Sequence, residues 1–283
     1  MGLRMLSAKI NAIDLVSHKE KTLHTIENSR GFYINELTAL PDKLFWVQSK
    51  DGQVSIEEMN LDSGKIRTVE SYDGENDILL QTDGKYLTWF LINGDKTCLK
   101  VYDTEKSDLF ILSEDIETAF PYARANVVEG ICSFPTKEYG KTVIKVLDLE
   151  TRAVINCFEL EQEHEIFNIV ADKQRCLYSL LKDGAPDWKI HVFNYSDKTE
   201  DEINSSEEYY VFSWQYPKGK LFINERNTNS IIIHDVSTGD ETAVSDNDYH
   251  LFILDGITGS GKYFVQDMAD YTKPVIYSVD IES

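Results

Sequence analysis

Cysteine is scarce in this sequence, and long hydrophobic runs are absent. The chain has four cysteines in 283 residues, and no two of them form a C-x-x-C pair. A chain of this length buries enough apolar surface without disulfides, so we expect its cysteines to be small buried hydrophobic residues. No segment approaches the roughly 18 consecutive apolar residues of a membrane helix. Arg4, Lys9 and Asp14 interrupt the region where a signal peptide needs an apolar run. Membrane insertion is therefore not expected, and the compartment stays open.

Basic residues are also in deficit. Lys and Arg number 28 against 49 Asp and Glu, which gives a formal net charge of −21. Nucleic acids and anionic membrane surfaces bind mainly through clustered Lys and Arg, so neither is an expected partner. The 42% of hydrophobic and 11% of aromatic residues suffice for a sizeable core. The composition thus indicates a folded, acidic protein.

The chain contains a repeat with a period of about 44 residues. In each copy an apolar stretch ends in Asp or Asn, and Ser or Thr follows three residues later in most copies. An Asp or Asn at a strand end accepts hydrogen bonds from backbone N–H groups two or three residues on, and a later hydroxyl reinforces the turn. We therefore interpret these side chains as turn formers and not as catalytic groups. The positions are Asp14, Asn60, Asp103, Asp148, Asn194, Asp235 and Asp280.

A second series of turns falls between the copies of the first. Gly, Asp or Lys precedes a strand rich in aromatic residues, as in Asp83-Gly84-Lys85 before Tyr86. Gly and Asp supply the positive φ of a tight hairpin. Two turn series in one period give four short antiparallel strands, A to D, with the second series between A and B and the first between C and D. Four such strands per repeat form a propeller blade.

The hairpin Asp83-Gly84-Lys85-Tyr86-Leu87-Thr88-Trp89 resembles the repeat signature of TolB-like and related WD40-like propellers. The resemblance extends over nearly the whole chain. It implies an all-β fold but no particular activity, because the superfamily ranges from scaffolds to hydrolases.

The number of strands predicts the architecture. The chain starts with strands C and D, continues through five full repeats and ends with A, B and C, which is closest to the requirement of six blades. We predict an all-β, six-bladed β-propeller with residues 1–283 in a single domain and residues 1–30 as closing strands. A seven-bladed propeller with an incomplete blade is the alternative. The predicted blades are approximately 31–73, 74–118, 119–163, 164–206, 207–247 and 248–283.

The predicted loops from strand D to the next strand A are acidic and are accompanied by tyrosines. In a propeller these loops and the B-to-C loops surround one mouth of the central channel. The acidic segments are 71–77, 113–117, 161–165, 205–208 and 245–248. Carboxylates and aromatic rings both favour cationic groups. The predicted ligand-binding residues are Tyr33, Tyr72, Asp73, Tyr122, His164, Tyr209, Tyr249 and His250.

Catalytic patterns are weak. Residues 256–262 fit G-x-x-x-x-G-K, but Tyr263 stands where Ser or Thr would bind magnesium, and the segment is an A-to-B hairpin. No G-x-S-x-G elbow occurs, and we interpret His191 and His234 as ordinary half-buried strand residues. Six-bladed calcium-dependent lactonases, which are related propellers, hold a metal through Glu, Asn and Asp, whose oxygens suit calcium. A loose similarity to them suggests Glu36, Asp77, Asn126 and Asn168 as metal ligands.

These patterns favour a monomeric, non-catalytic propeller without a cofactor. It would bind a protein, peptide or small cationic ligand at an acidic, tyrosine-bearing mouth. The alternative is a metal-dependent hydrolase or lyase with Ca²⁺ in its channel.

Overall fold

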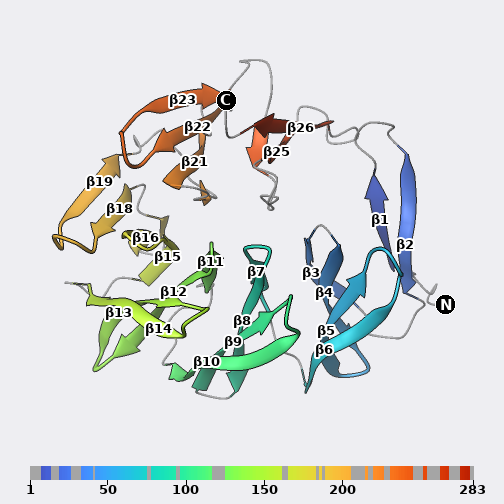
Figure 1. Cartoon of the computed structure of the whole chain (residues 1–283). Helices are drawn as coiled ribbons and strands as arrows, with labels where there is room; N and C mark the ends of the chain where they lie inside the picture. The colour runs from blue at the N-terminus through green and yellow to red at the C-terminus, as the bar shows by residue number, and fades with distance from the viewer. Residues whose placement is uncertain are drawn as a thin grey trace. The chain divides into compact units, whose positions relative to one another are not determined.

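The computed structural model of the chain consists almost entirely of antiparallel β-strands (Figure 1). The chain divides into two compact units, Met1–Leu80 and Gln81–Ser283. Within the described residues, no helix has the length and apolar character needed to cross a bilayer. The structure describes residues 8–13, 19–26, 33–40, 42–74, 78–93, 96–116, 125–160, 165–182, 185–186, 189–204, 214–215, 219–225, 230–244, 251–253, 262–267 and 275–280.

The first unit contains a two-stranded and a four-stranded sheet. In the two-stranded sheet, β1 (Ala8–Ile13) pairs with β2 (Glu20–Ile26). Ile10 of β1 packs against Trp46 and Met59 of the larger sheet, and the Trp46 ring lies 5.7 Å from that of His24. The larger sheet contains, in order, β3 (Tyr33–Ala39), β4 (Lys43–Lys50), β5 (Gln53–Asn60) and β6 (Ile66–Asp73).

The described residues of the second unit form five further sheets. Its first two are β7 (Gln81–Thr82), β8 (Tyr86–Asn93), β9 (Lys96–Asp103) and β10 (Asp108–Ile116), followed by β11 (Asn126–Val128), β12 (Ile131–Glu138), β13 (Lys141–Asp148) and β14 (Ala153–Glu159). The third is β15 (Glu165–Ala171), β16 (Arg175–Lys182), β18 (Lys189–Asn194) and β19 (Glu200–Asn204), with β17 (Ala185–Pro186) paired to β16. The last two are β20 (Trp214–Gln215), β21 (Lys220–Glu225), β22 (Ser230–Asp235) and β23 (Glu241–Val244), then β24 (Leu251–Ile253), β25 (Lys262–Asp267) and β26 (Val275–Asp280).

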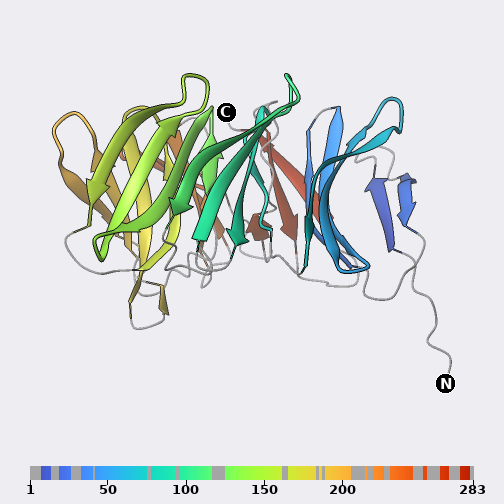
Figure 2. The same ribbon diagram turned by 90° about the horizontal axis from the view of Figure 1, so that it is seen from below.

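The sheet order repeats the chain order, so each four-stranded sheet has the A to D arrangement that the turn series predicted. The predicted pattern of two opening strands, five four-stranded repeats and three closing strands is confirmed, and β17 is an additional short strand. Figure 2 shows the strands of these sheets side by side, seen at 90° to the view of Figure 1. The number of blades, the closure of a ring and the single domain stay predictions.

The turns between strands C and D are closed by the predicted Asp and Asn side chains. Asp148 Oδ1 accepts hydrogen bonds from the N–H groups of Glu150 and Thr151 at 3.0 and 2.9 Å. The bond from the Thr151 N–H lowers the pKa of Asp148, against a smaller opposing effect of burial. The turn interpretation is confirmed here and in three further copies, Asn60, Asp103 and Asp235.

The copy at Asn194 uses a different acceptor. There Asp197 Oδ1 accepts from the N–H and the hydroxyl of Thr199 at 3.1 and 2.8 Å, while Asn194 donates its side-chain amide to Asp201 at 3.1 Å. Asp197 stands where most other copies carry Ser or Thr, so the acceptor comes from the third turn position instead of the strand end. Expecting Asn194 itself to accept the capping bonds was therefore wrong.

In the turn between strands A and B at residues 83–85, Asp accepts hydrogen bonds and Gly adopts the positive φ. Asp83 Oδ1 accepts from the N–H groups of Lys85 and Tyr86 at 2.9 and 2.8 Å, and Asp83 Oδ2 accepts from the N–H of Gly130 in the next sheet at 2.6 Å. Gly84 and Gly130 have φ of +100° and +77°, as glycine permits. Asp83 itself has no positive φ, so the expectation that Asp supplies it is wrong there.

A backbone hydrogen bond joins the two kinds of turn in each of five sheets. The residue after the turn Asp or Asn donates its N–H to the carbonyl oxygen just before strand B, over 2.8 to 3.2 Å. Both turn series therefore lie at one end of a sheet, and the B-to-C and D-to-A connections lie at the other. The five bonds run from Leu61 to Asp42, Thr104 to Lys85, Leu149 to Gly130, Tyr195 to Gln174 and Val236 to Gly219.

Strands B and C provide most of the core. One buried cluster joins Tyr86 and Leu99 of one sheet to Phe134 and Leu147 of the next. Neighbouring sheets of the second unit thus pack face to face through apolar and aromatic side chains. The aromatic residues that the sequence placed after the A-to-B turns are central to this packing.

The cysteines only partly follow expectation. Cys132 and Cys176 are buried and Cys98 is partly buried, but Cys157 is exposed. Cys157 lies on β14, which pairs with one neighbour only because it is the outermost strand of its sheet. Expecting Cys157 to be buried was therefore wrong.

Candidate functional site

Two predicted ligand-binding residues, Tyr72 and Asp73, lie at the end of β6. Expecting them in a loop was wrong, because residues 71–73 continue to pair with β5 as far as Gln53. The predicted acidic loop 113–117 was wrong for the same reason, because residues 113–116 belong to β10. Glu165, at the edge of the predicted loop 161–165, opens β15. Tyr33 opens β3, and its side chain is not described. The other five residues lie outside the described part of the chain, namely Tyr122, His164, Tyr209, Tyr249 and His250.

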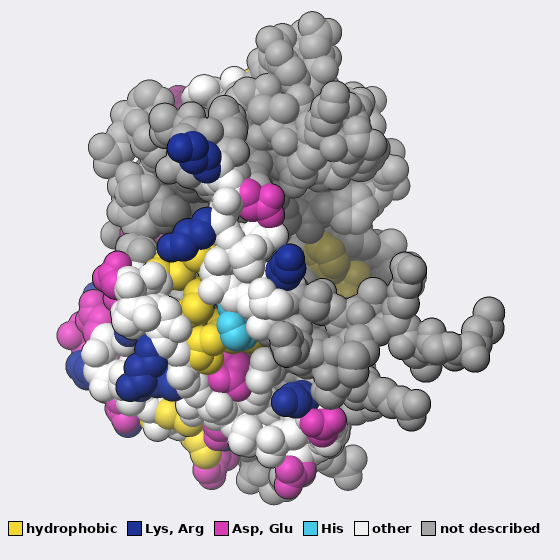
Figure 3. Space-filling view, turned by 90° about the vertical axis from the view of Figure 1, so that its right-hand side faces the viewer, with side chains coloured by type: hydrophobic (Ala, Val, Ile, Leu, Met, Phe, Trp, Pro, Cys, Tyr) yellow, Lys and Arg dark blue, Asp and Glu magenta, His cyan; other side chains and the backbone are white. Residues whose placement is uncertain are grey.

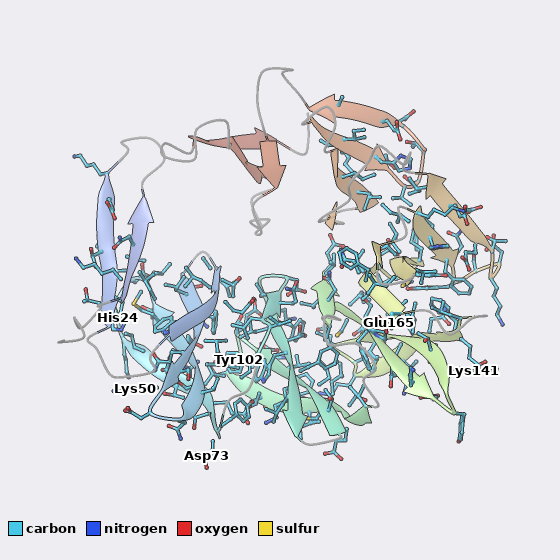
Figure 4. All side chains as sticks on the ribbon, turned by 180° about the vertical axis from the view of Figure 1, so that it is seen from behind. His24, Lys50, Asp73, Tyr102, Lys141 and Glu165 are labelled. Atoms are coloured by element: carbon cyan, nitrogen blue, oxygen red, sulfur yellow. The ribbon has the colours of Figure 1, made fainter. Side chains whose placement is uncertain are left out.

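An aromatic ring and carboxylates meet at this end of the first unit. The Tyr72 hydroxyl donates a hydrogen bond to the Glu70 carboxylate, and both side chains are half-buried. Asp73 is exposed, and its Oδ1 accepts from Nε2 of Gln53 at 3.5 Å. Figure 4 labels Asp73 together with Lys50, which lies at the same end of the sheet by strand register. The arrangement offers a cation both a π face and negative charge.

The predicted metal ligands lie in different surroundings. Asn126 opens β11, and Asn168 lies at a β-bulge of the adjacent strand β15. Asn168 Oδ1 accepts from the N–H of Ile169 at 2.9 Å, so this oxygen is engaged locally. Glu36 lies in a bulge of β3 with φ of +46°, and Asp77 lies outside the described residues.

Among the described residues, no group of three or more His, Cys, Asp or Glu side chains is placed to hold a metal ion. Asparagine oxygens are further possible ligands, and Asp77 lies outside the described residues. The calcium site therefore stays a prediction.

The two strand histidines are partnered by glutamates of the outer strands. Nδ1 of His191 lies 2.8 Å from Oε1 of Glu200, and Nδ1 of His234 lies 3.2 Å from Oε1 of Glu241. The His191 ring stacks on Tyr178 with 5.0 Å between centroids. Burial is the main cause that raises the pKa of Tyr178, and the negative charge of Glu200 is the next largest. The phenol therefore stays neutral. His234 is half-buried, as predicted. His191 is buried, with 8% of its area exposed, so the prediction of half-burial was wrong there because the ring is covered by Tyr178.

Two shallow cavities at the turn end of the second unit were not predicted. They have volumes of about 220 and about 440 Å³ and share Glu129 and Lys173. Their charged groups bridge neighbouring sheets: Lys173 Nζ lies 3.8 Å from Asp148 Oδ2, and Arg175 Nη1 donates to the carbonyl of Val236 at 3.0 Å. These bonds are typical of contacts that join sheets. The charged residues of the A-to-B turns were the available sequence signal.

Charges of both signs are interspersed among the described residues on one face of the molecule. Figure 3 shows Lys and Arg side chains among Asp and Glu side chains on one face. The described part of this face is therefore not uniformly acidic, and the acidic concentration stays a prediction for the connecting loops.

Comparison with known proteins places the chain by fold. No protein-family profile matches it, and no curated protein sequence is detectably similar. Among solved structures, it resembles the β-propeller domain of the Trilobed protease from Pyrococcus furiosus, with 14% identity, a TM-score of 0.60 and coverage of 89% of this chain and 82% of that one. A prolyl endopeptidase gives 13% identity and a TM-score of 0.62 over 95% of this chain, which spans only 44% of the endopeptidase chain.

A third structure, from the mitotic checkpoint complex, gives 11% identity and a TM-score of 0.59 over 98% of this chain and 83% of that one. Identities this low show the fold alone. The chain therefore has a β-propeller fold, as its repeats predicted.

Proposed function

We propose that this protein is a non-catalytic β-propeller that binds a protein, a peptide or a small cationic ligand. Binding occurs at the end of the sheets that carries the B-to-C and D-to-A connections. The observation that carries this proposal is the pairing of Tyr72 with Glu70 beside the exposed Asp73. A cationic group that approaches this end gains attraction from the carboxylates and the aromatic ring together.

The structure gives a reason to separate this end from the other. At the turn end, acids such as Asp83 and Asp148 already accept backbone hydrogen bonds that close turns. Asp73 is exposed, whereas Asp83 and Asp148 are partly buried, and its hydrogen bond with Gln53 is long, at 3.5 Å. Carboxylates at the connection end are therefore better placed to serve a ligand.

The proposal is tested by fluorescence anisotropy with a labelled octalysine peptide, and with octaglutamate as the opposite-charge probe. We expect octalysine to bind and the affinity to fall between about 50 and about 300 mM salt, because salt screens exposed charges. A triple variant, Asp73→Asn, Glu75→Gln and Asp77→Asn, removes three charges worth about 0.5 kcal/mol each. Its affinity should fall about tenfold.

A matched control removes three exposed acids at the turn end, through Asp62→Asn, Glu105→Gln and Asp240→Asn. It changes net charge equally but should alter octalysine affinity less than about twofold, because these residues lie at the opposite end of their sheets. Equal weakening by both triple variants would show attraction to net charge alone. That result, or no binding by the unaltered protein, would refute the proposed site.

The metal-dependent hydrolase or lyase is kept as the alternative. It is separated by thermal melting with Ca²⁺ or Mn²⁺, before and after chelation. A metal-dependent rise in melting temperature that disappears in Asn126→Ala or Asn168→Ala would favour the enzyme. A melting temperature that does not change with metal would favour the binding function.

A further inference from the structure

The smaller of the two cavities, with a volume of about 220 Å³, lies where turns of three consecutive sheets of the second unit meet. Its walls include the A-to-B turn of the first of these sheets, at Lys85 and Tyr86, and both turns of the second, at Glu129 and Glu150. Lys173 of the third sheet completes it. A water molecule takes up about 30 Å³, so the cavity has room for about seven water-sized groups. It therefore suits a small metabolite, because pockets for drug-sized ligands measure roughly 300–1,000 Å³.

Tyr86 lines this cavity with a hydroxyl group whose proton is unused. The residue is 2% exposed, and no group in the described part of the chain accepts that proton. Lys85 lies beside the phenol, with Nζ 5.1 Å from the ring centroid, and the interaction with Tyr86 is the main cause that raises the pKa of Lys85. An ammonium group only donates hydrogen bonds, so Lys85 is no acceptor for the hydroxyl. A buried donor left unused costs free energy, and a bound ligand that accepts from it removes this cost.

Opposite charges at the cavity are close together without neutralising each other. The negative charge of Glu150 contributes to the raised pKa of Lys85, yet among the described ion pairs none of 4.0 Å or less joins the two side chains. Glu129 is exposed, and its carboxylate has no hydrogen bond or ion pair within the described residues. By contrast, Asp83 and Asp148 accept backbone hydrogen bonds that close turns. Lys85 and the two glutamates are therefore available to a ligand.

We propose that this cavity binds a small free α-amino acid through its ammonium and carboxylate groups. The ligand carboxylate accepts hydrogen bonds from the Tyr86 hydroxyl and the Lys85 ammonium. The ligand ammonium donates to the carboxylates of Glu150 and Glu129, and such charge-assisted bonds are stronger than neutral ones. The site lies at the turn end of the sheets, so it is additional to the proposed binding function at the connection end.

Other small ligands match these groups less well. A simple anion is attracted by Lys85 but repelled by the two glutamates, and a simple cation meets the opposite combination. A metal ion is disfavoured, because no group of three or more His, Cys, Asp or Glu side chains among the described residues is placed to hold one. In an α-amino acid a single carbon atom separates the two charged groups. That short separation suits charged side chains that meet across so small a volume.

The proposal is tested on the unaltered full chain by thermal melting with each of the standard amino acids at about 10 mM, followed by calorimetric titration of those that stabilise. At ten times its dissociation constant a ligand should raise the melting temperature by about 3 °C. Ethanolamine and propionate are the ligand controls, because each carries only one of the two charges. An amino acid that binds should do so at least about tenfold more tightly than either control.

Two substitutions test the assigned contacts. Tyr86→Phe removes only the hydroxyl, so amino-acid affinity should fall about tenfold. The melting temperature without ligand should stay unchanged or rise, because the variant no longer buries an unused donor. Glu150→Gln changes an exposed side chain and should also weaken binding about tenfold.

Matched controls are Tyr139→Phe and Glu165→Gln. Both residues are exposed and lie at the connection end, Tyr139 between β12 and β13 and Glu165 at the start of β15. Each should change amino-acid affinity less than about twofold.

Three results overturn the proposal. The first is no rise in melting temperature with any amino acid. The second is ethanolamine or propionate binding as tightly as the best amino acid, which would indicate a site for a simple ion. The third is unchanged amino-acid affinity in both Tyr86→Phe and Glu150→Gln, which would place the binding elsewhere on the protein.

Discussion

Replacement of Asp83 by asparagine tests the contact between neighbouring sheets with a change of one functional group. Asp83 Oδ1 accepts two backbone hydrogen bonds within its own turn, and Oδ2 accepts one from Gly130 of the next sheet at 2.6 Å. Asparagine keeps one acceptor oxygen for the turn. Its NH₂ group then faces the Gly130 N–H, so that two donors meet.

The expected loss in the free energy of unfolding follows from the number and kind of hydrogen bonds that each substitution removes. A hydrogen bond to a charged group contributes about 1.5–3 kcal/mol, and Asp83 and Gly130 are both partly exposed. Asp83→Asn should therefore lower the free energy of unfolding by about 2 kcal/mol, a change of about thirtyfold in the unfolding equilibrium. Asp83→Ala loses all three bonds and should cost about 3–4 kcal/mol.

The assay is urea denaturation combined with hydrogen exchange at the Gly130 amide. Asp235→Asn is the control, because the bonds from Ser237 and Thr238 all reach Oδ1, and it should cost less than about 1 kcal/mol. An Asp83→Asn variant as stable as the unaltered protein, with the Gly130 amide still protected, would refute the assigned role of the bond.

Three further predictions concern acid stability, packing and thiol chemistry. The pKa values of Asp103, Asp148 and Asp235 are lowered in the folded state, so their stabilisation is present above the ordinary value of 3.8 and is lost as pH falls through the lowered values. The urea midpoint of Asp148→Asn should therefore fall less steeply between about pH 4 and pH 2, and an unchanged slope would contradict the turn bonds. Phe134→Ala, at a fully buried position between two sheets, should cost about 3–5 kcal/mol in chemical denaturation, whereas a loss below about 1 kcal/mol would mean loose packing. Cys157 should react with iodoacetamide before the two buried cysteines, as judged by peptide mass spectrometry. Its pKa is raised by partial burial and then by Glu138, so the rate should keep rising above pH 9.

The repeated parts of the fold could be predicted from sequence because their causes are local. An Asp or Asn at a strand end finds its N–H donors two or three residues away, as Asp148 does, so a short pattern contains the whole interaction. The glycine turns are equally local, since Gly84 needs only its own backbone freedom. Strand order within each sheet then follows from the spacing of the two turn series.

Other features depend on residues distant in sequence and were missed. The Asp83–Gly130 bond joins residues 47 positions apart, and no short pattern announces such a partner. The ends of β6 and β10 were placed too early because acidic residues there suggested loops, whereas pairing with β5 and β9 continues through them.

The backbone hydrogen bond that joins the two turns in five of the sheets has a consequence for how the sequence of the repeats can diverge. Its donor and acceptor are backbone atoms, so every amino acid except proline at the donor position conserves it. The five copies use Leu61, Thr104, Leu149, Tyr195 and Val236. The side chain at the donor position can therefore differ widely between repeats, or between related proteins, without loss of this hydrogen bond. The B-to-C and D-to-A connections at the opposite end can likewise change in sequence, and new binding specificities can arise there while the strand backbone stays the same.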